Sequence, residues 1–292
     1  MRVNAVTVFI GLWAALAVTG CAAARTPDVT RIALLAPFEG RYRELGYNVL
    51  YAARLAAAEA GNGSIDVLAV DDGGSVARAA DRARALALDP AVSAAIVLGY
   101  AASSTEAQQA FGELPVLVVG HWETPPVTDN IRIVAGRDLS DLITVPSQVG
   151  VTEAAALEPP IVGGEVLALE QFTRLRLSLD DIRLVSSGSL PGPDFTERYQ
   201  SGNLFAPEPG LLATLTYDAT RLLIEVVEAA AQRQISCCIR DAIDAALRDP
   251  AFQYQGMNGR IRFENGYWAD APVNAYRFGE VGELIAVNDL VE

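Results

Sequence analysis

The residues best suited to bind a small charged molecule follow an expected strand over residues 94–98. Gly99 starts a turn that carries Ser103 and Ser104 into a helix expected over residues 103–111. At such a junction, free backbone N–H groups and hydroxyls converge on one point, which suits an anion. A serine there can equally cap the helix, and one serine can do both. The spacing therefore predicts an anion site or a capped helix.

The catalytic chemistry open to the chain is narrow. His121 is the only histidine, and the sequence has no lysine, which excludes a Walker A loop and a Schiff base. His121 stands near Glu123, but no serine lies in a Gly-x-Ser-x-Gly elbow. Asp71 and Asp72 precede two glycines, so a turn is favoured over a metal site. We predict a protein that is not an enzyme and needs no cofactor or metal.

The overall charge argues against nucleic acid as a partner. The 292 residues carry a formal net charge of -14, which repels phosphate backbones. Apolar residues make up 51% of the chain, enough to bury a core.

The first residues have the pattern of a targeting segment. Arg2 precedes an apolar run over residues 5–18, and the run ends in Thr19, Gly20 and Cys21. This pattern resembles the lipobox of bacterial lipoproteins, in which the cysteine is acylated after cleavage. We expect a signal peptide over residues 1–20, a lipid on Cys21, a tether over residues 21–30 and attachment to the outer face of a membrane. The alternative is a buried N-terminal helix.

The remaining cysteines, Cys237 and Cys238, are adjacent. Adjacent cysteines rarely pair with each other, and no cluster of histidine or cysteine completes a metal site. We expect two partly buried thiols on a helix.

Strand-like and helix-like segments alternate along the sequence, and these elements position the residues described above. Continuous apolar runs favour strands covered by helices on both faces, and a unit repeats about every thirty residues, as βαβ crossovers do. The pattern therefore predicts an α/β fold with a doubly wound parallel sheet. Strands are expected over residues 31–37, 65–70, 94–98, 116–119, 131–134, 161–164, 182–186, 259–263, 273–278 and 284–287. Helices are expected over residues 46–60, 76–88, 103–111, 167–176, 211–231 and 239–248.

The order of elements and several short strings resemble the branched-chain amino-acid-binding family of ABC importers, which are type I periplasmic binding proteins. The strings are residues 32–37 with Gly46, 71–74, 89–92, Gly99 with Ser103 and Ser104, 161–165, 217–219 and 259–263. The resemblance implies two α/β lobes joined by three crossings, with a solute held between them.

The lobes implied by the resemblance are unequal. Lobe 1 is expected from residues 31–125 and 190–265, and lobe 2 from residues 126–189 and 266–292. Residues 137–158 fill the place of two βα units, which together need about sixty residues, so lobe 2 is expected to be truncated.

The resemblance also implies a set of ligand-binding residues. Ser103, with Ser104 beside it, would accept the carboxylate of the solute, and Thr124 would add a second hydroxyl. Glu165 would pair with an ammonium group, although it also fits a solvated glutamate after a glycine turn. The apolar side chains Tyr42 and Leu45 would cover the solute. Trp122 stands where the family usually has a small residue.

Two functions fit these expectations. One is a membrane-anchored protein that binds a small amino-acid-like solute for an ABC permease and its ATPase. The other is a lipoprotein of the same fold that acts as a protein scaffold or sensor without solute transport.

Overall fold

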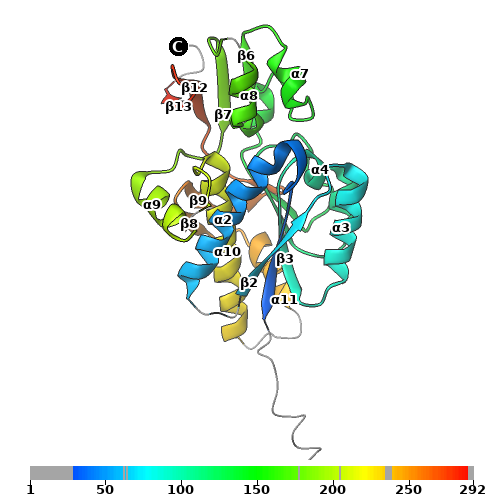
Figure 1. Cartoon of the computed structure of the whole chain (residues 1–292). Helices are drawn as coiled ribbons and strands as arrows, with labels where there is room; N and C mark the ends of the chain where they lie inside the picture. Colours follow the sequence, from blue (N-terminus) through cyan, green and yellow to red (C-terminus); the bar gives the residue numbers. More distant parts are fainter. Residues whose placement is uncertain are drawn as a thin grey trace, which may run out of the picture.

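A seven-stranded sheet forms the centre of the larger lobe, in the order β10-β11-β5-β4-β3-β1-β2 (Figure 1). The computed structural model describes residues 29–61, 63, 65–176, 178–203, 205–233 and 239–288. The predicted signal peptide, Cys21, Cys237 and Cys238 lie outside the described residues. The strands are β1 (Thr30–Ala36), β2 (Ile65–Asp71), β3 (Val92–Val97), β4 (Val116–Val119), β5 (Ile131–Val134), β10 (Phe263–Glu264) and β11 (Tyr267–Trp268).

The sheet is parallel except for the hairpin of β10 and β11. All residues of β3, β4 and β5 are buried, because helices cover both faces. The helices α2 (Arg43–Ala60), α10 (Leu211–Gln232) and α11 (Ile239–Arg248) lie on one face, and α3 (Val76–Leu88) and α5 (Thr105–Ala110) lie on the other (Figure 1). The predicted doubly wound sheet is confirmed.

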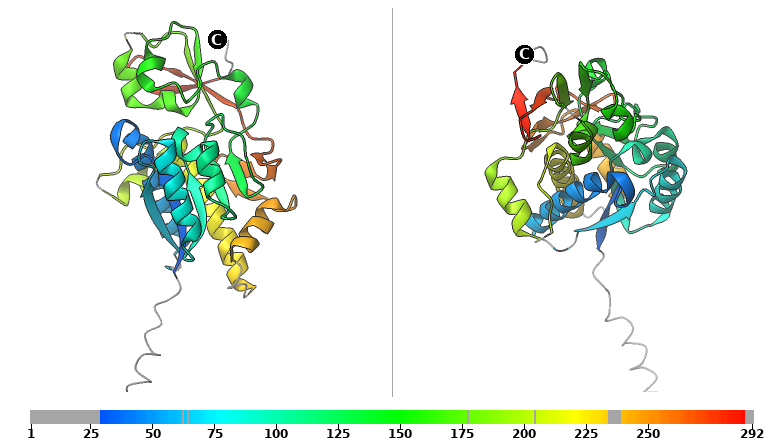
Figure 2. Two further views of the ribbon diagram at one scale, coloured as in Figure 1. Left: turned by 90° about the vertical axis from the view of Figure 1, so that its right-hand side faces the viewer. Right: turned by 45° about the horizontal axis from the view of Figure 1, so that its top comes forward.

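The smaller lobe has a four-stranded sheet in the order β13-β12-β7-β6. Its strands are β6 (Ile161–Gly163), β7 (Ile182–Ser186), β12 (Asn274–Phe278) and β13 (Leu284–Val287). The pair β6 and β7 is parallel, whereas β12 is antiparallel to both β7 and β13. Figure 2 shows this C-terminal pair, in red, beside the green segments from the middle of the chain.

Short helices complete the smaller lobe: α6 (Leu139–Leu142), α7 (Val151–Ala155), η2 (Glu165–Ala168) and α8 (Glu170–Leu175). Residues 137–158 thus form two short helices, and an isolated bridge joins Val145 to Gly163 of β6.

Other elements flank the larger lobe. They are η1 (Gly40–Tyr42), α4 (Tyr100–Ser103), α9 (Pro193–Ser201) and the hairpin of β8 (Tyr254–Gly256) and β9 (Gly259–Ile261). The hairpin is tied to α10, because the Asp218 carboxylate accepts hydrogen bonds from the backbone N–H groups of Met257 and Asn258, both at 2.9 Å.

The expected lobe boundaries need two corrections. β5 falls in the stretch expected for lobe 2 but pairs with β4 in the larger sheet, and β11 pairs with β5. Both strands are too short for their partners to be inferred from their own residues. The helix expected over residues 103–111 is confirmed over residues 105–110, as α5. It begins later than expected, because Ser104, with an extended ψ of 156°, ends the separate helix α4 and precedes α5.

Candidate functional site

A cavity of about 410 Å³ lies where the two lobes meet. The larger lobe contributes the segments that follow β1, β2 and β3, among them Pro37, Asp72 and Gly99. The smaller-lobe side contributes Gln148 and Val166. Because the carboxyl ends of parallel strands meet at one edge of a sheet, this is where such folds place a ligand.

Three polar contacts join the lobes beside the cavity. The Tyr42 hydroxyl accepts from Val151 N at 3.3 Å, and Arg41 Nη1 donates to Thr152 Oγ1 at 3.1 Å. The Glu44 carboxylate accepts from the backbone N–H of Glu170, with its two oxygens at 3.1 and 3.2 Å. The structure therefore has its lobes in contact around the cavity.

The contact at Glu44 caps a helix of the opposite lobe. Leu169 stands at the N-cap position of α8 and has no side chain that can cap it. The Glu44 carboxylate from α2 caps the helix instead. Its negative charge also interacts favourably with the positive N-terminal end of the α8 dipole. Burial raises the pKa of Glu44.

Three of the expected site residues line the cavity: Tyr42, Leu45 and Trp122. The Trp122 side chain is fixed, since the residue is 4% exposed and its Nε1 donates to Val119 O at 2.7 Å. Its indole N–H is therefore used within the protein, and the ring forms an apolar wall. These contacts agree with a role in covering a solute, which remains a prediction.

Ser103, Ser104 and Thr124 are not among the residues that line the cavity. Ser103 is fully buried, and its hydroxyl donates to Gly99 O at 2.9 Å. The Ser104 hydroxyl accepts from Ala107 N at 3.3 Å, so Ser104 caps α5. The Thr124 hydroxyl lies 3.4 Å from Trp122 O. From the serine turn, the backbone at Gly99, Tyr100 and Ala101 reaches the cavity instead.

Glu165 lies inside the protein and does not line the cavity. It is 1% exposed, so the alternative of a solvated glutamate is wrong. Its Oε1 accepts from Ser186 Oγ at 2.7 Å, and its Oε2 accepts from His121 N at 3.3 Å. Burial raises the pKa of Glu165, and the hydrogen bonds from Ser186 and His121 oppose that rise. Both carboxylate oxygens are therefore already engaged.

Polar residues around Glu165 form a group that is here called the hinge cluster. It consists of the buried residues His121, Ser147, Glu165 and Ser186 and the half-buried Glu123. Glu123 Oε1 accepts from Ser147 Oγ at 2.8 Å and Ser147 N at 3.0 Å. Burial raises the pKa of Glu123 and lowers the pKa of His121. The cluster connects the segment after β4 with the start of η2 and the end of β7, so it joins the two lobes.

The sequence argument missed Asp72 as a residue of the site. Asp71 does build the expected turn, since its carboxylate accepts from the backbone N–H groups of Phe38, Glu39 and Gly73. Asp72 also serves the turn, since its Oδ1 accepts from Gly74 N at 2.8 Å, and it lines the cavity. The available signal was its place directly after β2, at the same edge of the sheet as Gly99.

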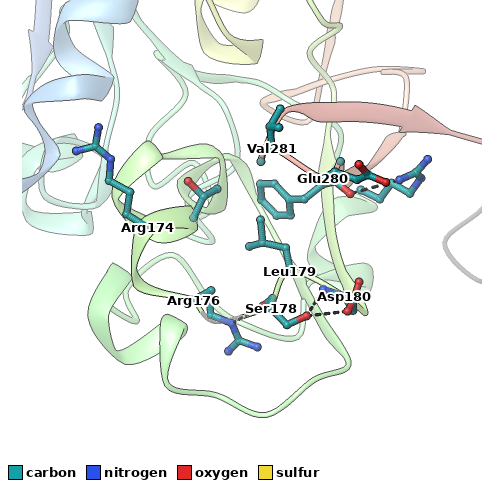
Figure 3. A pocket seen from close by; sticks show the side chains of 12 residues that line it. Arg174, Arg176, Ser178, Leu179, Asp180, Glu280 and Val281 are labelled. Carbon is teal, nitrogen blue, oxygen red and sulfur yellow. Dashed lines mark hydrogen bonds between the residues drawn. The ribbon is translucent and has the colours of Figure 1, made fainter.

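Larger hollows lie on the outer surface, and one is at the far end of the smaller lobe (Figure 3). Its polar groups bond to the protein itself: Ser178 Oγ to Asp180 at 2.8 Å, and Arg176 Nη1 to Ala155 O at 3.0 Å. Arg174 pairs with Glu170 outside the hollow. With its charged groups engaged, this hollow is a weaker candidate than the cavity between the lobes.

No group of three or more metal-binding side chains occurs in the part of the chain that the structure describes. Among the helices of that part, none is long and apolar enough to cross a bilayer.

Comparisons with known proteins identify the fold. No family model matches the chain, and no curated protein sequence does. A leucine-binding protein, LivK, from Thermotoga maritima matches in structure with a TM-score of 0.67 and 14% identity, over 89% of this chain and 98% of that one. LivJ from Streptococcus pneumoniae, in complex with isoleucine, has a TM-score of 0.61 and 14% identity, over 89% and 100%. A solute-binding protein of an ABC transporter from R. palustris, in complex with benzoate, has a TM-score of 0.64 and 12% identity, over 89% and 95%.

These likenesses establish a type I periplasmic-binding-protein fold for the chain. Among the similar structures, LivJ and a protein from Desulfitobacterium hafniense in complex with Leu are substrate-binding proteins of transporters.

Proposed function

We propose that the protein is the extracytoplasmic solute-binding component of an ABC importer and holds a small amino-acid-like solute between its lobes. The observation that carries the proposal is the cavity between the lobes, which is walled by Leu45, Trp122 and Val166. A largely apolar cavity with a few polar groups is typical of sites for small molecules. The similar structures of proteins bound to isoleucine, leucine and benzoate support the same class of function.

The way the lobes meet supports binding by closure. Tyr42 lines the cavity and also accepts a hydrogen bond from Val151 of the smaller lobe. A solute can contact both lobes at once only when the lobes are closed. It therefore binds the closed arrangement more tightly and shifts the equilibrium toward it. A permease can distinguish the closed arrangement from the open one.

Calorimetric titration with a panel of aliphatic amino acids tests the proposal. Ala101 lines the cavity, so Ala101→Leu fills part of the site and should abolish the heat of binding. Ala77 is exposed on α3, so Ala77→Leu makes the same change outside the cavity and should leave binding intact. Absence of heat with every solute would favour the scaffold or sensor function instead.

The proposed anchor is a lipid on Cys21, which follows Thr19 and Gly20 at the end of the apolar run. An acyl anchor would hold the acidic domain at the membrane without help from charge. Cys21→Ser should move the protein from the membrane fraction to the soluble fraction of the envelope. A parent protein that carries no lipid by mass spectrometry would refute the anchor and leave the solute-binding proposal untouched.

A further inference from the structure

Asp72 places a buried carboxylate at the wall of the cavity. It follows β2 directly, and its backbone N–H donates to Ala36 O at 3.0 Å, which fixes the residue beside the end of β1. Asp72 is 2% exposed and lines the cavity together with Gly99.

The two oxygens of the Asp72 carboxylate differ in their contacts. Oδ1 accepts from Gly74 N at 2.8 Å. Oδ2 accepts no hydrogen bond from the described residues, and it lies 3.9 Å from the position that a Cβ on Gly99 would occupy. Oδ2 is not one of the fully enclosed polar atoms of the described residues that lack a partner, so it is accessible from the cavity. This oxygen is therefore suited to a group that the protein itself does not supply.

No cation of the described residues neutralises Asp72. It takes part in none of their ion pairs. Arg41 is the arginine that lines the cavity, but its side chain is exposed at the rim and donates to Thr152. A buried carboxylate without a cation favours a positively charged group on the ligand.

Glu165 does not compete with Asp72 for that group. Both Glu165 oxygens accept hydrogen bonds within the hinge cluster, and Glu165 does not line the cavity. The walls near Asp72 also include apolar side chains, of which Leu45 and Trp122 are the largest. The site therefore combines one buried negative charge with an apolar enclosure.

We propose that Asp72, on the larger lobe, receives the protonated amino group of the ligand, and that the cavity takes a primary ammonium compound with an apolar body. The inference rests on the proposed solute-binding function and names the residue that determines its specificity. Tight binding would then require the amino group, whereas a carboxylate on the ligand would be dispensable.

Three ligands with similar carbon skeletons test the proposal by calorimetric titration of the full mature chain. They are 3-methylbutan-1-amine, which has only the ammonium group, L-leucine, which has both charges, and 4-methylpentanoate, which has only the carboxylate. The amine and leucine should bind to the parent protein, and the carboxylate should not. Asp72→Asn should weaken the binding of the amine and of leucine about ten- to a hundredfold, the usual effect of losing a charge-assisted hydrogen bond.

Glu39→Gln is the matched control, because Glu39 also lines the cavity but is exposed at its rim. It removes the same charge and should change the affinity less than about threefold, as expected for a solvated carboxylate. Asparagine at position 72 keeps an oxygen for Gly74 N, and a thermal melt checks that the variant folds. If it does not fold, the comparison of the three ligands on the parent protein decides the matter.

The outcomes separate the two proposals. Binding of 4-methylpentanoate alone, or equal binding of leucine to the parent and to Asp72→Asn, would overturn the assignment of Asp72 and leave solute binding in place. Failure of all three ligands and of the amino-acid panel would refute the solute-binding function, and this inference with it.

Discussion

The free energy of unfolding should contain a contribution from Glu165 that is lost as the pH rises, and replacing Glu165 by glutamine should remove this pH dependence. Burial raises the pKa of Glu165 above its ordinary value of 4.5. Between the unfolded pKa and the raised folded pKa, the folded state binds more protons than the unfolded state. The stabilising contribution is therefore complete below the unfolded pKa and is lost as the pH rises through the folded pKa.

The size of the effect follows from the proton balance of one group. One proton difference changes the free energy of unfolding by at most about 1.4 kcal/mol for each pH unit. Glutamine keeps an oxygen that can accept from His121 N and an amide that can donate to Ser186 Oγ, but it does not titrate. The stability of Glu165→Gln relative to the parent should therefore rise with pH over that window and become constant above it.

Taking the difference between the two proteins removes the effects of other groups. Burial also raises the pKa of Glu44, Asp72 and Glu123, which gives slopes of the same sign, and lowers that of His121, which gives the opposite slope. These groups are present in both proteins, so their contributions largely cancel.

Urea unfolding followed by tryptophan fluorescence at pH 5, 6, 7 and 8 measures the difference, provided that the m-value stays constant. Glu158→Gln is the control at an exposed glutamate. A difference between Glu165→Gln and the parent that is independent of pH, or that falls as the pH rises, would refute the argument.

Three further substitutions test the packing around the site. A Cβ on Gly46 would lie 2.1 Å from Pro37 O, so Gly46→Ala should lower the melting temperature by several degrees, whereas Gly202→Ala, with open space around it, should leave the melt nearly unchanged. Trp122→Ala should cost about 3 to 5 kcal/mol in urea unfolding and should allow the cavity to bind bulkier solutes by calorimetry. Asp218→Ala leaves two N–H groups of the β8–β9 hairpin without their acceptor, so it should cost about 2 to 5 kcal/mol and speed hydrogen exchange there; unchanged exchange would contradict the role of Asp218.

Local patterns predicted the elements better than their partners. The continuous apolar runs of β1 and β3 identify these segments as strands. A strand that is covered on both faces needs apolar residues at successive positions, and this pattern is visible in the local sequence. β11 has two residues, and its pairing with β5 depends on a contact more than 130 residues away in sequence. Such a pairing leaves no local signal, and the lobe boundary was misplaced for this reason.

The site shows the same limit. The capping role of Ser104 follows from residues close in sequence, whereas the place of Tyr42 and Leu45 at the cavity was implied by the family resemblance. The burial of Glu165 depends on Ser186 and His121, which are 21 and 44 residues away. Both Asp71 and Asp72 form the turn expected from the sequence, but the place of Asp72 at the cavity depends on the arrangement of the strands.

The antiparallel pairing of β12 with β7 has a consequence for how the chain folds. Val185 and Ala275 face each other in that pair, so half of the smaller sheet comes from residues that are synthesised well after β6 and β7. Until they arrive, β6 and β7 form a pair of three and five residues, which is too small to be stable alone. The smaller lobe therefore completes late and through contacts distant in sequence, which form slowly. In the meantime the apolar residues of β7 are accessible to chaperones and to aggregation, and the pairing of β12 with β7 is the step that ends this exposure.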